Sequence, residues 1–206
     1  MKTTIITLAT IATLALGLGN KSIAADKDGV ANKAEVSTVL TTVNKISKIE
    51  VRGNVEVYVT DGADDQVKVY NRYYSESALI QNNNGTLRIS SFADQKLVVW
   101  VTAYDLRSIS VYDNAEVRSF GKLSPLELDV TLNNNSYAKL DMSGYSANIK
   151  VNDRAKADLS GNVTEGSLRY DRSASVNSTN FVAENSSRIV NADRTKRNII
   201  EEWAGL

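Results

Sequence analysis

The chain has 206 residues, with 24 Lys and Arg against 24 Asp and Glu, no Cys, no His and a single Pro. This length suits one domain, or one domain with an appendage, and can bury a substantial core. Without Cys there is no disulfide framework and no Cys zinc site, and without His the Ser-His-Asp and Cys-His nucleophile systems are excluded. The balanced charge argues against a nucleic-acid binder, which normally carries a basic stripe.

Residues 1–25 are predicted to be a cleaved secretory signal peptide. Lys2 supplies a positive start, residues 5–18 form an uncharged run rich in apolar residues, Thr and Ala, and small residues allow cleavage after Ala24 or Ala25. The uncharged run is too short to cross a bilayer comfortably, since a spanning helix needs about 20 residues. We therefore expect an exported protein with no membrane span after signal cleavage.

Three further segments follow the predicted signal. Residues 26–45 are polar and weakly periodic, which is typical of a flexible leader whose last part could join the first strand. Residues 46–196 are predicted to be a single folded domain. Residues 197–206 are predicted to be a C-terminal cap, because only this end of the chain could make a short amphipathic turn or helix. The apolar contacts of this cap would be Ile199, Ile200 and Trp203.

The domain is predicted to be all-β. Apolar and polar residues alternate with period 2 over residues 49–59, which indicates a strand with one buried face. Residues 61–65 form an acidic turn, and residues 82–85 (Asn-Asn-Asn-Gly) carry the strongest turn signal, since Asn and Gly tolerate positive φ. Residues 97–101 form a nearly continuous apolar strand.

An internal repeat of about twenty residues is indexed by Ala115, Ala138, Ala155 and Ala174, which are 23, 17 and 19 residues apart. A large aliphatic residue stands six positions before each of them. A period of about twenty residues suits one coil of a β-solenoid, in which short strands stack about 4.8 Å apart. The pattern therefore predicts a solenoid, with an antiparallel β-sandwich as the alternative.

Five segments carry a family resemblance, namely residues 49–59, 67–70, 84–89, 97–101 and 106–117. Together with the later repeats they resemble the head GIN domain of putative autotransporter adhesins, over most of the chain after the signal. The resemblance implies a single-domain right-handed parallel β-helix with coils of about 20 residues, and no established enzymatic activity. It also implies export, which we place in the periplasm or at the cell surface of a Gram-negative bacterium. The sequence departs from the family at its Gly- and Ser-rich corners, where it carries residues such as Asp113-Asn114-Ala115.

Few residues suggest chemistry. Asp141 and Asp158 recur in two similar turn-like segments and could stack into a carboxylate pair for glycoside hydrolysis, although solvated corners are the simpler interpretation. Asp61, Asp64 and Asp65 resemble part of a calcium loop but lack the spacing and the final Glu of an EF-hand. We therefore assign no catalytic residue, no metal ligand and no cofactor-binding residue, and we expect no cofactor.

Tyrosines give the best hint of recognition, because an exposed Tyr on a rigid scaffold offers a large contact area at low entropic cost. Tyr is also simply a good strand former, and the repeat tyrosines differ in phase, so they should not form one stripe. The tyrosines concerned are Tyr112, Tyr137 and Tyr170 in the repeats and the cluster Tyr70, Tyr73 and Tyr74. Basic residues alternate with apolar ones as on the outside of a strand, at Lys139, Lys150, Arg154, Lys156 and Arg169.

These observations lead to one function hypothesis and two alternatives. The leading hypothesis is an exported, non-catalytic module that binds or scaffolds a protein or polysaccharide at the cell envelope. The first alternative is a polysaccharide lyase or glycoside hydrolase that uses carboxylates on the β-helix surface, which is an analogy of fold alone. The second is a purely structural spacer. The oligomeric state and the identity of the binding residues are left open.

Overall fold

The computed structural model describes residues 37–40, 45–70 and 78–191. Among these residues no helix is long and apolar enough to cross a membrane. The predicted signal peptide and the predicted cap at 197–206 lie outside the described residues. Of the predicted leader, 26–45, the described part includes one short strand at Ser37–Leu40.

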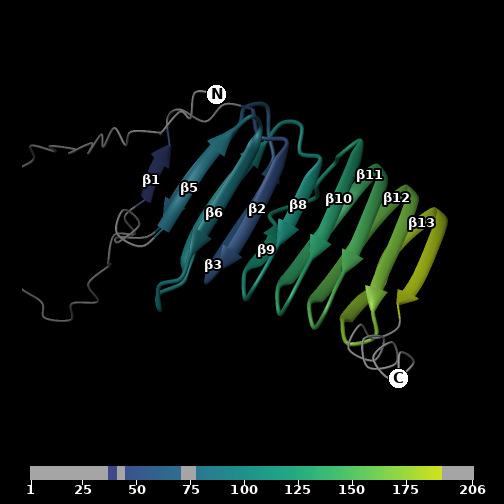
Figure 1. The fold of residues 1–206 in the computed structure, drawn as a ribbon. Helices are drawn as coiled ribbons and strands as arrows, with labels where there is room; N and C mark the ends of the chain where they lie inside the picture. Colours follow the sequence, from purple (N-terminus) through teal and green to yellow (C-terminus); the bar gives the residue numbers. More distant parts are fainter. Residues whose placement is uncertain (1–36, 41–44, 71–77, 192–206) are drawn as a thin grey trace, which may run out of the picture.

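All strands of the described residues belong to one 13-stranded sheet. The sheet order is β1-β4-β7-β3-β9-β11-β10-β8-β2-β6-β5, and β12 and β13 continue from β11. Figure 1 shows one side of this stack running from β5 to β13. The strands are β1 (Ser37–Leu40), β2 (Lys48–Gly53), β3 (Val55–Asp61), β4 (Gln66–Tyr70), β5 (Ala78–Asn83), β6 (Thr86–Ser91), β7 (Leu97–Ala103), β8 (Ser108–Val111), β9 (Glu116–Ser119), β10 (Glu127–Leu132), β11 (Tyr137–Val151), β12 (Lys156–Asp171) and β13 (Ser175–Asn191).

The sheet is mixed, so the all-β prediction is confirmed but the right-handed parallel β-helix is wrong. In the described residues β1–β4, β4–β7 and β5–β6 pair antiparallel, and the other pairs are parallel. The reversal at β5–β6 comes from Asn84 and Gly85, whose positive φ angles of 50° and 79° close a two-residue hairpin. The predominance of parallel pairs in one sheet also rules out the antiparallel sandwich.

The sheet curls like a half-barrel around one hydrophobic core. The first residues of β11 pair with β9, whereas its last residues pair with β10, so this long strand joins the two halves of the sheet. The predicted alternation is confirmed, because the five aliphatic residues of the 49–59 run are all buried. Strand β7 repeats the pattern, with Leu97, Val99 and Val101 inward and the residues between them outward. The outward positions of β7 therefore include Trp100, which lies between the buried Val99 and Val101.

The parallel strands are aligned differently from the repeat inferred from the sequence. Ser136, and not Ala138, is the residue that lies between Ala115 and Ala155, because the backbone carbonyls of all three accept equivalent bonds from the next strand. The predicted repeat position Ala138 is therefore wrong by two residues, and Ser136 is the residue that corresponds to Ala115 and Ala155. Ser136 is fully buried, and its hydroxyl accepts a hydrogen bond from the backbone N–H of Asn133 at 3.1 Å.

Acidic and amide side chains hold the successive corners together in what we call the corner ladder, formed by Gly53, Asp113, Asn134, Asp153 and Asp171. The N–H of each of the first four donates to the side chain of the next, over 2.9–3.2 Å. Asp113, Asn134 and Asp153 adopt φ angles of 57–61°, which Asp and Asn tolerate better than most residues. These bonds connect successive corners in a chain that has no disulfides.

Candidate functional site

Four aromatic side chains gather on the outer face of the sheet, and we call Tyr58, Tyr70, Trp100 and Phe120 the aromatic cluster. The Trp100 ring stacks on Tyr58 at a centroid distance of 4.9 Å and an interplanar angle of 22°. Phe120 and Tyr70 meet Trp100 edge-on, at 4.8 and 6.3 Å. Phe120 is 58% exposed although it is a large apolar side chain. The cluster therefore presents apolar ring surface to solvent.

The strand pairing explains why these rings meet. Trp100 points outward because its neighbours Val99 and Val101 fill the inward positions of β7. Tyr58 lies directly opposite Trp100 in the parallel β3–β7 pair. Strand β4 runs antiparallel along the other edge of β7 and brings Tyr70 to the same face. The cluster thus forms where β7 pairs in parallel with β3 on one side and antiparallel with β4 on the other.

Arg118 of β9 forms the charged border of the aromatic cluster. It lies opposite Tyr58 in the β3–β9 pair. Its Nε donates to Glu56 Oε1 at 2.9 Å, and its Nη2 donates to Glu116 Oε2 at 2.8 Å. The guanidinium also lies 5.0 Å from the centroid of the Tyr137 ring, within the range of a cation–π contact. Arg118 is therefore oriented by two carboxylates and a ring.

Glu116, a carboxylate beside the cluster, is held in its charged form. Burial acts to raise the pKa of Glu116, but hydrogen bonds from Lys96 and Arg118 outweigh it and hold that pKa below its ordinary value. The Lys96 ammonium lies 2.6 Å from Glu116. A general acid needs a carboxyl group whose pKa is raised, so Glu116 is unsuited to that role.

Two tyrosine hydroxyls near the border are bonded to carboxylates. The Tyr58 hydroxyl donates to Glu56 at 3.0 Å, and this bond is the main reason why the pKa of Tyr58 is raised. The Tyr137 hydroxyl donates to Asp158 at 2.6 Å, and burial together with that bond raises the pKa of Tyr137. Both hydroxyls are therefore protonated near neutral pH, and the bonds fix the orientation of the two rings.

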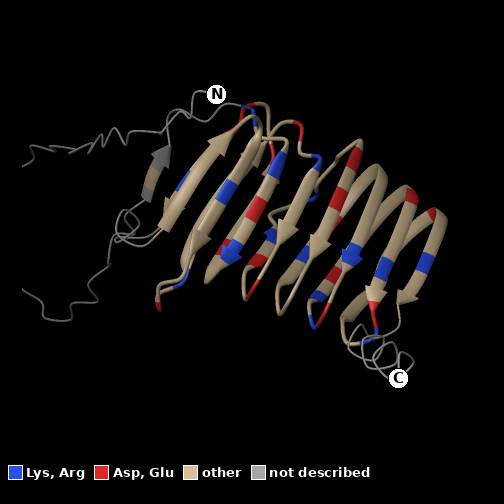
Figure 2. Cartoon of the chain, viewed as in Figure 1, with Lys and Arg blue, Asp and Glu red and all other residues tan. Residues whose placement is uncertain are grey.

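A shallow groove of about 710 Å³ adjoins this border, and we call it the cationic groove. It contains three cationic side chains and one carboxylate, and that carboxylate, Glu116, already binds Lys96 and Arg118. In the view of Figure 2 the two signs of charge are otherwise interspersed along the strands. The groove is lined by Asn114, Glu116, Arg118, Asn135, Tyr137, Arg154 and Lys156.

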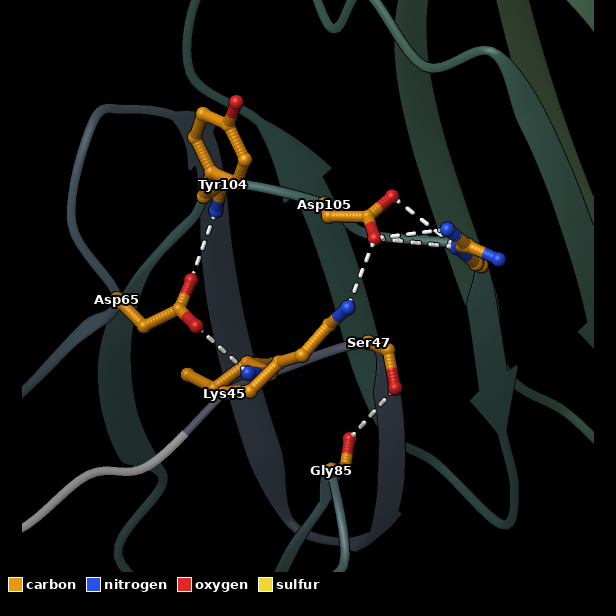
Figure 3. A network of polar contacts seen from close by, with 8 residues as sticks. Lys45, Ser47, Asp65, Gly85, Tyr104 and Asp105 are labelled. Atoms are coloured by element: carbon orange, nitrogen blue, oxygen red, sulfur yellow. Dashed lines mark hydrogen bonds and ion pairs between the residues drawn. The ribbon is translucent and has the colours of Figure 1, made fainter.

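In the acidic turn that resembled a calcium loop, Asp65 binds backbone N–H groups of the protein. Asp65 Oδ2 accepts the backbone N–H of Ile46, and its Oδ1 accepts that of Tyr104, both at 2.7 Å (Figure 3). Asp65 thereby joins the start of the domain to the turn after β7. Within the described part of the chain, no three acidic side chains gather as ligands for a metal ion, and this includes Asp61 and Asp64.

The same network ties the chain near Lys45 to two neighbouring turns. Asp105 binds Arg107 at 2.9 Å and Lys45 at 3.0 Å, and these hydrogen bonds, with Arg107 contributing most, lower the pKa of Asp105 (Figure 3). The Ser47 hydroxyl donates to the carbonyl of Gly85 at 3.2 Å. These bonds join the segment at residues 45–47 to three turns that are distant in the sequence, so we interpret the network as structural.

The two carboxylates considered for glycoside hydrolysis do not stack. In the β11–β12 pair Asp141 lies opposite Ser160, and Asp158 lies opposite Lys139. The two Asp residues are on adjacent strands but displaced by two residues along them, and Asp158 is bonded to Tyr137. The hypothesis assumed an offset of 17 residues between these strands, whereas the observed offset is 19.

The repeat tyrosines lie apart, as their phases predict. Tyr112 packs beneath the Arg52 guanidinium at 3.7 Å, and Tyr170 contacts Arg188 at 5.1 Å. Of the three, only Tyr137 borders the cationic groove. The five basic residues named from the sequence are all exposed, at Lys139, Lys150, Arg154, Lys156 and Arg169.

Sequence reasoning found only part of the aromatic cluster. Tyr70 was noted, and its predicted companions Tyr73 and Tyr74 lie outside the described residues. Trp100 and Phe120 were not singled out. The available signal was the outward phase of Trp100 in a strand whose alternate residues are Leu97, Val99 and Val101.

A β-sheet scaffold that displays aromatic and charged side chains on an outer face is typical of a recognition module. The chain belongs to the family described as "putative auto-transporter adhesin, head GIN domain", which matches residues 45–193. The resemblance seen in the sequence is thereby confirmed. No curated protein matches the chain.

Solved structures from Parabacteroides distasonis share the fold. One is a putative lipid binding protein, with a TM-score of 0.59 and 8% identity over 75% of this chain and 78% of that chain. Another is a putative adhesin, with a TM-score of 0.52 and 21% identity over 76% of this chain and 78% of that chain. At these identities the likeness shows the fold alone.

Proposed function

We propose that the protein is an exported, non-catalytic module that binds a protein or polysaccharide at the bacterial cell envelope through the aromatic cluster. The observation that carries this proposal is the gathering of four rings on one outer face of the sheet. The family description, that of an adhesin, supports a binding role outside the cell. The predicted signal peptide supports export.

The energetics of the cluster support binding. Exposed apolar surface costs free energy in water, and an aromatic side chain that a partner desolvates is a common hot spot of binding. The Trp100 ring is fixed by contacts with Tyr58 and Phe120, so little side-chain entropy is lost when a partner packs against it. Arg118 and Glu56 supply polar groups at the border.

No specific observation on the described residues favours the alternative, a polysaccharide lyase or glycoside hydrolase. The two carboxylates nearest the cluster, Glu56 and Glu116, are both bonded to Arg118. Asp141 and Asp158 are out of register with each other. A binding role needs none of these groups to exchange a proton.

The experiment compares variants for binding to immobilised cell-envelope preparations. Phe120→Ala and Trp100→Ala should each weaken binding about thirty-fold, because truncating a hot-spot aromatic costs about 2 kcal/mol. The matched control is Phe92→Ala, since Phe92 is an exposed Phe (75%) after β6 and outside the cluster. Equal binding by the wild type, Phe120→Ala and Trp100→Ala, with all proteins folded by circular dichroism, would overturn the proposal.

A further inference from the structure

We infer that the partner is an acidic polysaccharide, whose sugar rings pack on the aromatic cluster while its carboxylate or sulfate groups bind in the cationic groove. This inference rests on the proposed function and names the ligand class of the same site. Three features carry it: the continuity of the cluster and the groove, the excess of positive charge among the residues that line the groove, and the exposure of two of its cations, Arg154 and Lys156, which form no ion pair with another described residue.

The cluster and the groove form one continuous surface. Trp100 on β7, Tyr58 on β3 and Arg118 on β9 lie opposite one another in consecutive strand pairs. Arg118 in turn lies opposite Lys139 on β11 and contacts the Tyr137 ring. From β7 to β12 this surface crosses four strand spacings, about 19 Å. That length accommodates an extended chain of several units.

The positive charge of the groove exceeds what its carboxylates neutralise. The whole chain has a formal net charge of zero, yet the groove holds Arg118, Arg154 and Lys156 against Glu116. Glu116 is bonded to Lys96 as well as to Arg118. Its charge is therefore already compensated.

Arg154 and Lys156 are the cations available to a ligand. Both are exposed, and neither forms an ion pair with another described residue. Lys139 is similarly exposed and lies on the adjoining strand. Guanidinium and ammonium groups at such positions bind carboxylate and sulfate groups through charge-assisted hydrogen bonds.

A polysaccharide fits these features better than the other polyanions. A nucleic acid normally meets a basic stripe, whereas here a few cations stand beside an apolar cluster. The apolar faces of sugar rings can pack on exposed aromatic side chains, and their hydroxyl groups can reach Glu56 and Arg118 at the border. The combination of rings and cations therefore suits a polymer that is both a sugar and an acid.

The test measures binding of the full chain to three soluble polymers: dextran, dextran sulfate and polygalacturonate. Dextran and dextran sulfate share a backbone, so their difference isolates the anionic groups. We expect binding to the two acidic polymers, at least about tenfold stronger than to dextran and weaker at higher salt. Binding to neither acidic polymer, or equal binding to dextran, would overturn the inference.

Matched variants locate the binding. Arg154→Gln with Lys156→Gln should weaken binding to the acidic polymers about tenfold or more. The control is Lys150→Gln with Arg169→Gln, which removes the same charge from exposed positions that lie opposite each other elsewhere on β11 and β12. An equal loss in the two double variants would show a non-specific charge effect and would overturn the inference.

The envelope assay separates this inference from the proposed function. If envelope binding depends on Trp100 but not on Arg154 and Lys156, or is abolished by protease treatment of the envelope, the ligand is not an acidic polysaccharide and the proposed function stands. If Trp100→Ala leaves envelope binding unchanged, the proposed function itself fails. If polysaccharide-degrading treatment and Arg154→Gln with Lys156→Gln both abolish envelope binding, the inference is supported.

Discussion

Replacement of Gly53 by Ala should destabilise the fold far more than the same change at Gly121. Both glycines have positive φ, +80° at Gly53 and +81° at Gly121, so an added side chain costs about 1–2 kcal/mol of backbone strain at either position. At Gly53 the new Cβ would also lie 2.1 Å from the carbonyl oxygen of Ser91, whereas at Gly121 it would meet no atom within 4 Å. Relief of that overlap must separate β2 from β6, because Gly53 and Ser91 are paired.

The overlap adds about 1–3 kcal/mol, the usual cost of forcing an extra carbon into a packed site. The free energy of unfolding should therefore fall by about 2–5 kcal/mol in Gly53→Ala and by about 1–2 kcal/mol in Gly121→Ala. Urea unfolding followed by tryptophan fluorescence and circular dichroism measures both values. Equal losses in the two variants would refute the reasoning, since the only difference it invokes is the contact with Ser91.

Three further predictions concern the border, the corner ladder and the C-terminal end. Lys96 and Arg118 lower the pKa of Glu116 despite burial, so the ion pairs of Glu116 stabilise the fold above about pH 4.5, and this stability is lost as pH falls through the lowered pKa. Glu116→Gln should therefore weaken the pH dependence of the free energy of unfolding in acid. An unchanged pH dependence in this variant would contradict the prediction. Asp171→Ala should cost about 1–3 kcal/mol in urea unfolding by leaving a corner N–H without its acceptor, while Asp171→Asn should cost less, and equal losses would argue against the ladder. Deletion of residues 197–206 should cause dimerisation or aggregation by light scattering if they are a cap, and an unchanged monomer would refute that assignment.

The inward and outward faces of the strands could be predicted from the sequence, because side chains alternate with a period of two wherever the backbone is extended. The pattern of β2 and β3 gave the buried positions correctly from Ile49 to Val59. Strand direction could not be predicted in the same way, since parallel and antiparallel partners present the same alternation. For the β5–β6 pair, the turn at Asn84-Gly85 contained the missing information, because its two positive φ angles reverse the chain.

The two-residue error in aligning the second copy of the repeat affected the predicted contacts between strands but not the predicted burial. A shift of two residues leaves every side chain on its original face, so Ala138 was correctly expected to point inward. The shift does change which residues are neighbours. It made Asp141 and Asp158 appear to stack, although they pair with Ser160 and Lys139. Predictions about burial therefore survived, while predictions about contacts between strands did not.

The aromatic cluster could not be predicted from the sequence either, because it depends on which strands are neighbours. Tyr58 and Trp100 are about forty residues apart in the chain and meet only because β7 pairs with β3. Their side chains contribute little to the core, which is formed by the inward residues of the same strands. Substitutions on the outer face should therefore alter ligand preference without disturbing the fold, whereas substitutions at inward positions such as Val57 and Val99 should not be tolerated in that way. The same inward residues can thus support different outer faces on one scaffold.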